Sequence, residues 1–250
     1  MIDKDLARRV FSCIDNTTLN ATDNEKSVEA FCRRTMDMRL ADGTTVAAVC
    51  VYPMFVGVAK RVLEGSGIRV ASVAGAFPHG QLPLSLRLEE VHRVVEDGAD
   101  EVDVVINRGL LLAGEYGAVC KEVAEMKSAC KGRKLKVILE TGELSPLLVR
   151  RAAQRAIDGG ADFIKTSTGK IATGATIEAA EAMLNVVNEN VKFNKKNIGF
   201  KVSGGIKTPE EALEYAGLAK KIVGNNYINN QTFRIGTSRL TESLYSLLTF

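Results

Sequence analysis

Short apolar runs rich in Val and Ile alternate with longer amphipathic stretches along the whole chain. The short runs favour β-strands, and the stretches between them have the periodicity of helices. The expected strands are Val10–Asp15, Val46–Tyr52, Arg69–Ala74, Glu101–Asn107, Leu135–Glu140, Phe163–Ser167, Ile198–Ser203 and Phe233–Gly236. The expected helices include Leu86–Glu96, Glu115–Ala129, Leu147–Ile157, Ile177–Asn188 and Pro209–Leu218.

Eight such strands in 250 residues give about 31 residues for each strand–helix unit, as in a (β/α)8 barrel. Ser145-Pro146 and Thr208-Pro209 each place a capping residue before a first-turn proline, and Thr208 with Glu211 fits a capping box. No Pro/Gly/Ser-rich linker divides the chain. The pattern therefore predicts the α/β class, with residues 1–250 forming a single-domain TIM barrel.

The chain also contains an internal repeat. Gly98-Ala-Asp-Glu-Val-Asp103 aligns with Gly160-Ala-Asp-Phe-Ile-Lys165 at an offset of two strand–helix units. In each copy a glycine ends a helix and a strand begins shortly afterwards. The repeat places Asp103 and Lys165 at equivalent depths in two different strands.

Three of the expected strands contain a charge among apolar neighbours, namely Asp103, Lys165 and Lys201. Because side chains alternate along a strand, Lys165 shares a face with Phe163 and Ser167. The three charges lie toward the carboxyl ends of their strands, where barrel enzymes build active sites. A buried ammonium must be paired or lose its proton.

This combination is typical of a Schiff-base site. A lysine amine attacks a carbonyl only when neutral, and burial and a second cation both lower its pKa. Lys165 and Lys201 come from consecutive strands, and Asp103 could move protons between them and the substrate. Spacing alone does not decide which lysine is the nucleophile. The alternative is a structural ion-pair network in the barrel mouth.

Glycine-containing loops follow the last three strands. Barrels commonly bind phosphate there, because free backbone N–H groups point at the anion. The loops are Thr168–Lys170, Ser203–Thr208 and Ile235–Ser238. They predict a phosphate site at the mouth.

Composition narrows the classes of function. Hydrophobic residues make up 46% of the chain and charged residues 25%, the net charge is +3, and Trp is absent. These values exclude wholesale disorder and argue against a nucleic-acid or membrane partner. The apolar run Val46–Ala59 is too short for a membrane span, and the N-terminus lacks the apolar core of a signal peptide. A cytoplasmic protein is expected.

The cysteines and histidines do not suggest a metal site. Five cysteines lack CxxC spacing, and two distant histidines argue against zinc. His92 is expected on a solvated helix face. His79 lies in a loop that could approach the mouth, and Cys50 lies on a strand that could line the barrel.

Six segments together resemble the deoxyribose-phosphate aldolase family, in order and over nearly the whole chain. They are Ile14–Leu19, Glu101–Ile106, Leu139–Leu144, Phe163–Lys170, Gly199–Ile206 and Phe233–Ser238. The resemblance implies a class I aldolase without a metal or cofactor, on a TIM barrel. Such an enzyme cleaves 2-deoxy-D-ribose 5-phosphate reversibly to acetaldehyde and D-glyceraldehyde 3-phosphate, in deoxyribonucleotide catabolism.

The same resemblance implies a role for individual residues. Lys165 would form the Schiff base, Lys201 would perturb it and share in proton transfer, and Asp103 would be the acid/base. Asp15 would position the second lysine and the substrate hydroxyls. The implied phosphate neighbourhood is Lys170, Gly204, Gly205, Gly236 and Ser238. The family also implies a homodimer.

Two departures accompany the resemblance. Some family members end in a flexible tail with a terminal tyrosine, whereas this chain ends in Leu247–Phe250, and Lys207 stands where others often have arginine. Two other functions stay open at this point. One is another Schiff-base aldolase or transaldolase, and the other is a non-catalytic phosphosugar-binding barrel.

Overall fold

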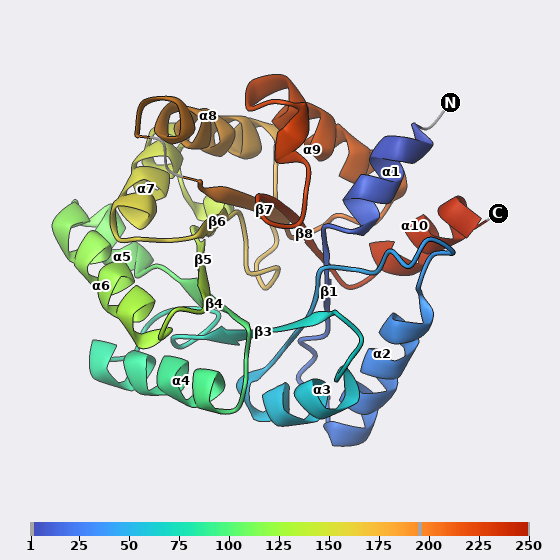
Figure 1. The fold of residues 1–250 in the computed structure, drawn as a ribbon. Helices are drawn as coiled ribbons and strands as arrows, with labels where there is room; N and C mark the ends of the chain where they lie inside the picture. The colour runs from blue at the N-terminus through green and yellow to red at the C-terminus, as the bar shows by residue number, and fades with distance from the viewer. Residues whose placement is uncertain (1–2, 195–196, 250) are drawn as a thin grey trace.

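The computed structural model describes residues 3–194 and 197–249. Eight parallel strands pair in sequence order, and β8 pairs with β1 to close a barrel (Figure 1). This confirms the predicted TIM barrel. The strands are β1 Ile14–Thr17, β2 Ala48–Val51, β3 Arg69–Ala74, β4 Glu101–Val105, β5 Lys134–Ile138, β6 Phe163–Lys165, β7 Gly199–Ser203 and β8 Phe233–Thr237.

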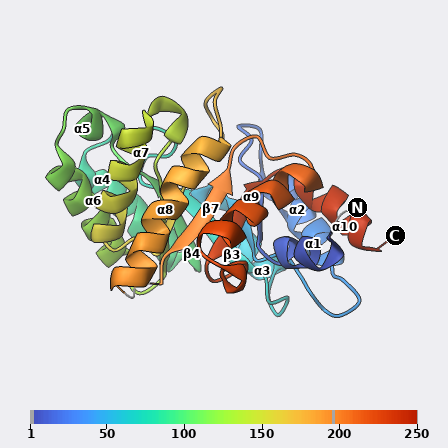
Figure 2. The ribbon, with the colours of Figure 1, turned by 90° about the horizontal axis from the view of Figure 1, so that it is seen from above.

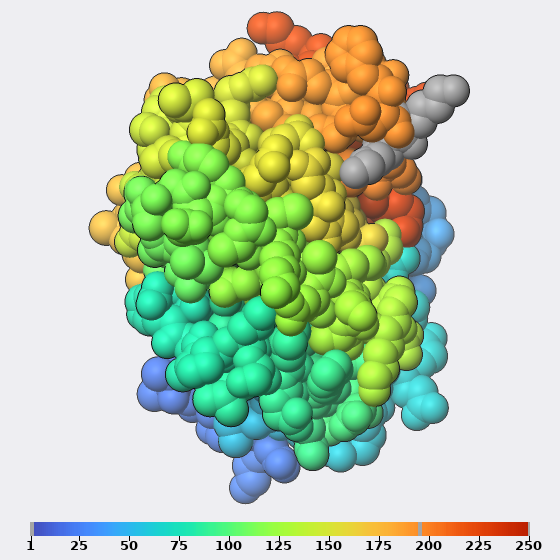
Figure 3. All heavy atoms as spheres, turned by 90° about the vertical axis from the view of Figure 1, so that its left-hand side faces the viewer, coloured from blue at the N-terminus to red at the C-terminus, as the bar shows by residue number. Residues whose placement is uncertain are grey.

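Helices surround the barrel (Figure 1), and Figure 2 shows α6, α7 and α8 side by side along its outside. On the side of α4 to α7 their side chains close over the sheet (Figure 3). The first and last helices pack against each other, near the two ends of the chain (Figure 1). The helices are α1 Lys4–Phe11, α2 Glu25–Asp37, α3 Val56–Val62, α4 Leu84–Glu96, α5 Arg108–Leu112, α6 Tyr116–Ala129, α7 Pro146–Asp158, α8 Ile177–Asn194, α9 Pro209–Ile222 and α10 Leu240–Thr249.

The two predicted helix starts are confirmed. The Ser145 hydroxyl accepts a hydrogen bond from the Leu148 backbone N–H at 3.4 Å. Thr208 and Glu211 form the capping box, each accepting from the other's backbone N–H, at 3.3 and 3.1 Å. Each cap satisfies backbone donors that the first helical turn leaves unpaired.

The predicted strand Val10–Asp15 is wrong at its start. Val10 and Phe11 belong to α1, and β1 begins only at Ile14. Asp3 caps this helix through the Leu6 N–H, and Val10 and Phe11 lie on its buried face. A short apolar run fits a buried helix end as well as a strand, so periodicity did not separate the two.

The core has two parts, divided by the sheet. The larger lies between the strands and the helices and contains the outward residues Ile164, Phe200 and Val202. The smaller lies inside the barrel on β2 and β3, where Ala48, Cys50, Ala71 and Val73 gather with Leu19. Apart from the Phe163 ring, the rest of the interior is mainly polar, because β1 and β4 to β8 direct charged side chains inward. No helix in the described part of the chain is long and apolar enough to cross a membrane.

Candidate active site

The three charges predicted from the strand patterns meet inside the barrel. The Nζ atoms of Lys165 and Lys201 each lie 2.8 Å from the same oxygen, Oδ2 of Asp103. β6 and β7 are neighbours in register at this point, with Lys165 opposite Lys201. All three side chains are at least 95% buried. Asp103 and Lys165, which the internal repeat aligned, are therefore in direct contact.

A fourth predicted residue, Asp15, lies beneath Lys201. Its Oδ2 is 2.5 Å from the Lys201 Nζ, and its Oδ1 accepts from Arg234 at 2.5 Å. The carboxylate is completely buried. Asp15 therefore holds Lys201 from below.

The strand patterns also contain three inward charges that the sequence analysis missed: Glu101, Lys136 and Arg234. The Lys136 Nζ lies 2.8 Å from Asp103 Oδ1 and 2.6 Å from Glu101 Oε2. Arg234 binds Glu101 through both guanidinium nitrogens, at 2.7 and 3.1 Å. The alternation that placed Lys165 inward applies equally to these residues and could have found them.

The network moves the pKa values of the two active-site lysines in opposite directions. Burial is the largest effect on the pKa of Lys165, and together with the charge of Lys201 it outweighs Asp103 and lowers that pKa. Burial also acts on Lys201, but Asp103 and Asp15 together outweigh it and raise the Lys201 pKa. Lys165 is therefore the amine that loses its proton more easily.

The carboxylate between the lysines stays charged. Burial alone would raise the pKa of Asp103, but the ammonium groups of Lys136, Lys165 and Lys201 hold it well below its usual range. Asp103 is thus a fixed anion shared by three cations.

A pocket of about 330 Å³ opens at the carboxyl ends of the strands and reaches Lys165. Asp103 and Lys201 do not line this pocket and are fully buried, so they lie below its surface, whereas Lys165 is part of the surface. A ligand entering from the mouth meets the Lys165 amine first.

The loops predicted to bind phosphate line this same pocket. Lys170, Gly204, Gly205, Gly236 and Ser238 all contribute to its wall. Two further basic side chains do so as well. They are Lys207, noted from the sequence, and Arg239, which the sequence analysis missed. In this structure the Lys170 ammonium donates to the Leu19 carbonyl and lies over the Tyr52 ring.

Two of these glycines are needed for close packing. A Cβ on Gly236 would lie 3.0 Å from the Lys201 Cε and 2.9 Å from the Ser203 Cβ. Gly204 has a φ of +94°, and a Cβ there would lie 3.0 Å from the Ser167 hydroxyl. Gly236 therefore leaves room for the second lysine, and Gly204 lets the loop after β7 fold against the loop after β6.

Glu140 holds the loop that follows Lys165, a role that no sequence pattern predicted. It adopts a left-handed conformation with φ of 58° and is fully buried. Its carboxylate accepts from the Ser167 hydroxyl at 2.7 Å and from both the backbone N–H and the hydroxyl of Thr168. These bonds fix the chain directly after Lys165.

His79 and Cys50 stay outside the mouth pocket. His79 lies 3.5 Å from an Arg108 nitrogen. Cys50 lies inside the barrel, as its strand position predicted, and burial raises the pKa of its thiol. Within residues 3–194 and 197–249, no three His, Cys, Asp or Glu side chains are arranged to hold a metal ion.

Comparison with known proteins points to a family of aldolases. The model of the DeoC/LacD family of aldolases matches residues 9–232. The solved structure of QR15, an aldolase, is 31% identical and covers 99% of this chain and 96% of its own, with a TM-score of 0.79. The tetrameric deoxyribose phosphate aldolase of Aeropyrum pernix is 28% identical and covers 98% and 92%, with a TM-score of 0.75.

Proposed function

The chain belongs to the DeoC/LacD family of aldolases, and from that premise we propose that it cleaves 2-deoxy-D-ribose 5-phosphate through a Schiff base on Lys165. The products are acetaldehyde and D-glyceraldehyde 3-phosphate, and the reaction is reversible. The observation that carries the proposal is the shared oxygen of Asp103. Two lysines bind it, and only the one with the lowered pKa, Lys165, is open to the mouth pocket.

The reaction begins at the amine. Neutral Lys165 attacks the C1 aldehyde of the open-chain sugar phosphate to give a carbinolamine. Protonated Lys201 and the Asp103 carboxylate lie next to that nitrogen and help the carbinolamine hydroxyl leave as water. The product is an iminium on Lys165, which acts as an electron sink.

Carbon–carbon cleavage follows. The C3 hydroxyl loses its proton, the C2–C3 bond breaks, and its electron pair moves into the iminium to form an enamine. D-Glyceraldehyde 3-phosphate leaves. The enamine is then protonated at C2, and water hydrolyses the resulting iminium to free acetaldehyde and the Lys165 amine. Asp103 and Lys201 supply and take up these protons through water.

The phosphate group anchors the far end of the substrate. Lys170, Lys207 and Arg239 provide positive charge around the glycine loops of the mouth pocket. Binding the phosphate away from C1 holds the aldehyde next to Lys165. The binding energy of the phosphate group is thereby used to position the reacting carbon. Self-association stays a prediction for this chain.

Borohydride trapping tests the proposal. The protein is mixed with 2-deoxyribose 5-phosphate, reduced, and analysed by intact mass and peptide mapping. We expect a stable adduct on Lys165 that disappears in Lys165→Ala. Lys192→Ala, which removes a lysine from the far part of α8, is the matched control and should keep the adduct.

Other outcomes separate the alternatives. An adduct on Lys201 would keep the imine chemistry and overturn the assigned roles. An adduct formed with other sugar phosphates, but not with this one, would indicate a different Schiff-base aldolase or transaldolase. A folded protein that binds the phosphosugar without any adduct would contradict the aldolase chemistry and indicate a binding barrel.

A further inference from the structure

A second pocket lies at the opposite end of the barrel, where β3, β4 and β5 begin. We call it the basal pocket, formed by residues within 60–70, 100–101 and 132–134. Its volume is about 770 Å³, more than twice that of the mouth pocket. Barrel active sites lie at the carboxyl ends of the strands, so the proposed aldolase reaction does not account for this pocket.

Positive charge prevails in the basal pocket. Its lining has five basic and three acidic residues. The basic residues are Lys60, Arg61, Arg69, Arg133 and Lys134, and the acidic ones are Glu64, Asp100 and Glu101.

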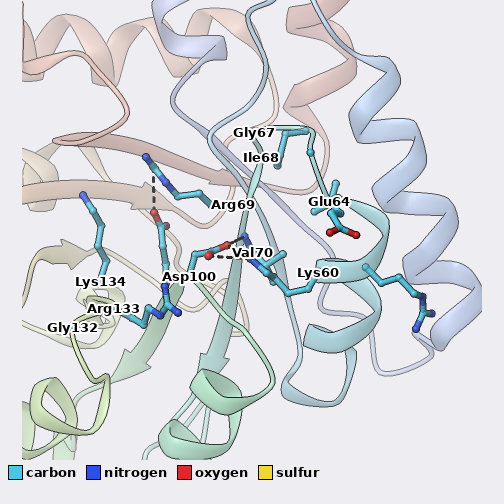
Figure 4. Close-up of a pocket in the computed structure, with 14 residues that line it drawn as sticks. Lys60, Glu64, Gly67, Ile68, Arg69, Val70, Asp100, Gly132, Arg133 and Lys134 are labelled. Carbon is cyan, nitrogen blue, oxygen red and sulfur yellow. Dashed lines mark hydrogen bonds and ion pairs between the residues drawn. The ribbon is translucent and has the colours of Figure 1, made fainter.

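Two of these residues, Lys60 and Asp100, neutralise each other. The Lys60 ammonium lies 3.0 Å from both carboxylate oxygens of Asp100 (Figure 4). Asp100 also accepts from the Val70 backbone N–H at 2.8 Å. This pair therefore fixes the pocket wall and leaves no charge for a ligand.

Glu101 is neutralised mainly from inside the barrel. Arg234 binds it through two nitrogens, and Lys136 lies 2.6 Å from it. Arg69 approaches the same carboxylate only to 3.5 Å, the longest of these contacts, and its side chain is one-third exposed. Arg69 is thus a guanidinium in the pocket whose charge is largely uncompensated.

Lys134 lines the basal pocket together with Arg69. Figure 4 shows the nitrogen ends of both side chains on the same side of the pocket. Lys134 donates to the neutral Gln231 amide oxygen at 2.9 Å and forms no ion pair with the described residues. Burial is the main cause of its lowered pKa; the charge of Glu101 raises that pKa, and the charges of Arg234 and Arg69 lower it.

We propose that the basal pocket binds a small phosphate-bearing anion between the Arg69 guanidinium and the Lys134 ammonium. A guanidinium fork matches two phosphate oxygens, and an ammonium adds a point charge. A phosphate monoester carries close to two negative charges at neutral pH, which matches the excess of two basic residues in the lining. The buried Leu63, Ile68 and Val70 also line the pocket.

Amide NMR with inorganic phosphate as the probe tests this site, with ionic strength held constant by chloride. We expect saturable shifts of the amides of residues 65–70 and 132–134. Arg69→Gln/Lys134→Gln should weaken this binding about tenfold or more, because charge-assisted hydrogen bonds are lost. Lys220→Gln/Lys221→Gln removes the same charge from the exposed surface of α9 and should leave the binding unchanged.

The NMR experiment distinguishes phosphate bound at the mouth from phosphate bound in the basal pocket. Phosphate bound at the mouth shifts the amides around Gly204 and Ser238, so a failure of the proposed function at the mouth leaves the basal result readable. Basal shifts that are absent or never saturate, or that weaken equally in both double variants, would overturn the basal site. If the Arg69→Gln/Lys134→Gln spectrum shows unfolding, Arg133→Gln tests the same lining from an exposed position and should weaken the binding.

Discussion

Lys165 and Lys201 have the same side chain, are both almost fully buried and bind the same carboxylate oxygen. Their different pKa directions come from the second carboxylate. Asp15 contacts Lys201 at 2.5 Å and helps to raise its pKa, whereas Lys165 has only Asp103. A single aspartate on β1 thus separates a lysine whose charged form is favoured from one that can become a nucleophile.

Replacing Lys201 tests this division of roles. Its positive charge disfavours protonation of Lys165, so Lys201→Met should raise the Lys165 pKa. Because the neutral amine reacts, the acid limb of the kcat/KM profile should move to higher pH. The rate at its optimum should fall about a hundredfold or more, as loss of acid–base assistance does.

The control for this variant keeps the charge. Lys201→Arg places a cation at the same position and should leave the acid limb close to that of the wild type, even if proton transfer slows. The pH dependence of borohydride trapping gives an independent reading of the Lys165 pKa. An acid limb that stays in place in Lys201→Met would contradict the electrostatic role of Lys201.

Among the elements, β6 and β7 approach each other closely where Phe163 of β6 meets Gly199 of β7. The Phe163 ring lies inside the barrel, below Lys165 on the same face of β6. A Cβ on Gly199 would come within 2.3 Å of this ring. A glycine at the start of β7 therefore lets an aromatic ring fill the barrel interior next to the charged residues.

Gly199→Ala should overfill this layer and destabilise the protein by about 1–3 kcal/mol. Phe163→Leu should relieve the clash, so that the double variant is more stable than the sum of the single effects predicts. Gly217→Ala is the control, because a Cβ on this residue of α9 meets no atom within 4 Å. It should stabilise the protein by up to about 1 kcal/mol through helix propensity. Urea unfolding midpoints measure all four variants, and a strictly additive double variant would contradict the proposed clash.

The elements also show how far sequence patterns reach. Buried parallel strands have continuous apolar runs, so seven of the eight began within two residues of the predicted position. The first strand did not, because the apolar residues Val10 and Phe11 belong to the buried face of α1. Helix α3 was not predicted, since the apolar run Val46–Ala59 passes from β2 into α3 without a break in hydrophobicity.

At the scale of the molecule, the barrel interior is a connected set of charges. Asp15, Glu101 and Asp103 share Lys136, which lies within 3.3 Å of all three carboxylates. Asp103, Lys165 and Lys201 could be identified because each is a charge within an apolar strand. Lys136 lies between Leu135 and Val137, and Arg234 lies between Phe233 and Ile235, so the same pattern marks these two residues as well. Only the closed barrel shows which of the polar residues face one another.

Asp15→Asn tests whether the stability of the buried charges inside the barrel depends on each member. Removing one carboxylate leaves Lys201 and Arg234 undercompensated in a buried site, which should cost about 3–5 kcal/mol at neutral pH. Glu29→Gln, at a half-buried position on the surface of α2, loses an i,i+4 pair with Arg33 and should cost less than about 1 kcal/mol. The difference is measured by urea unfolding with the wild type as reference.

The pH dependence of the Asp15→Asn effect has a definite sign. Burial would raise the pKa of Asp15, but Lys136, Lys201 and Arg234 lower it well below its ordinary value. A carboxyl with a lowered folded pKa contributes stability above its unfolded pKa, about 3.9, and loses it as the pH falls through the folded value. The gap between wild type and Asp15→Asn should therefore be full at pH 7 and shrink only below about pH 4. A gap that already closes near pH 6 would mean that Asp15 is not held ionised by these cations.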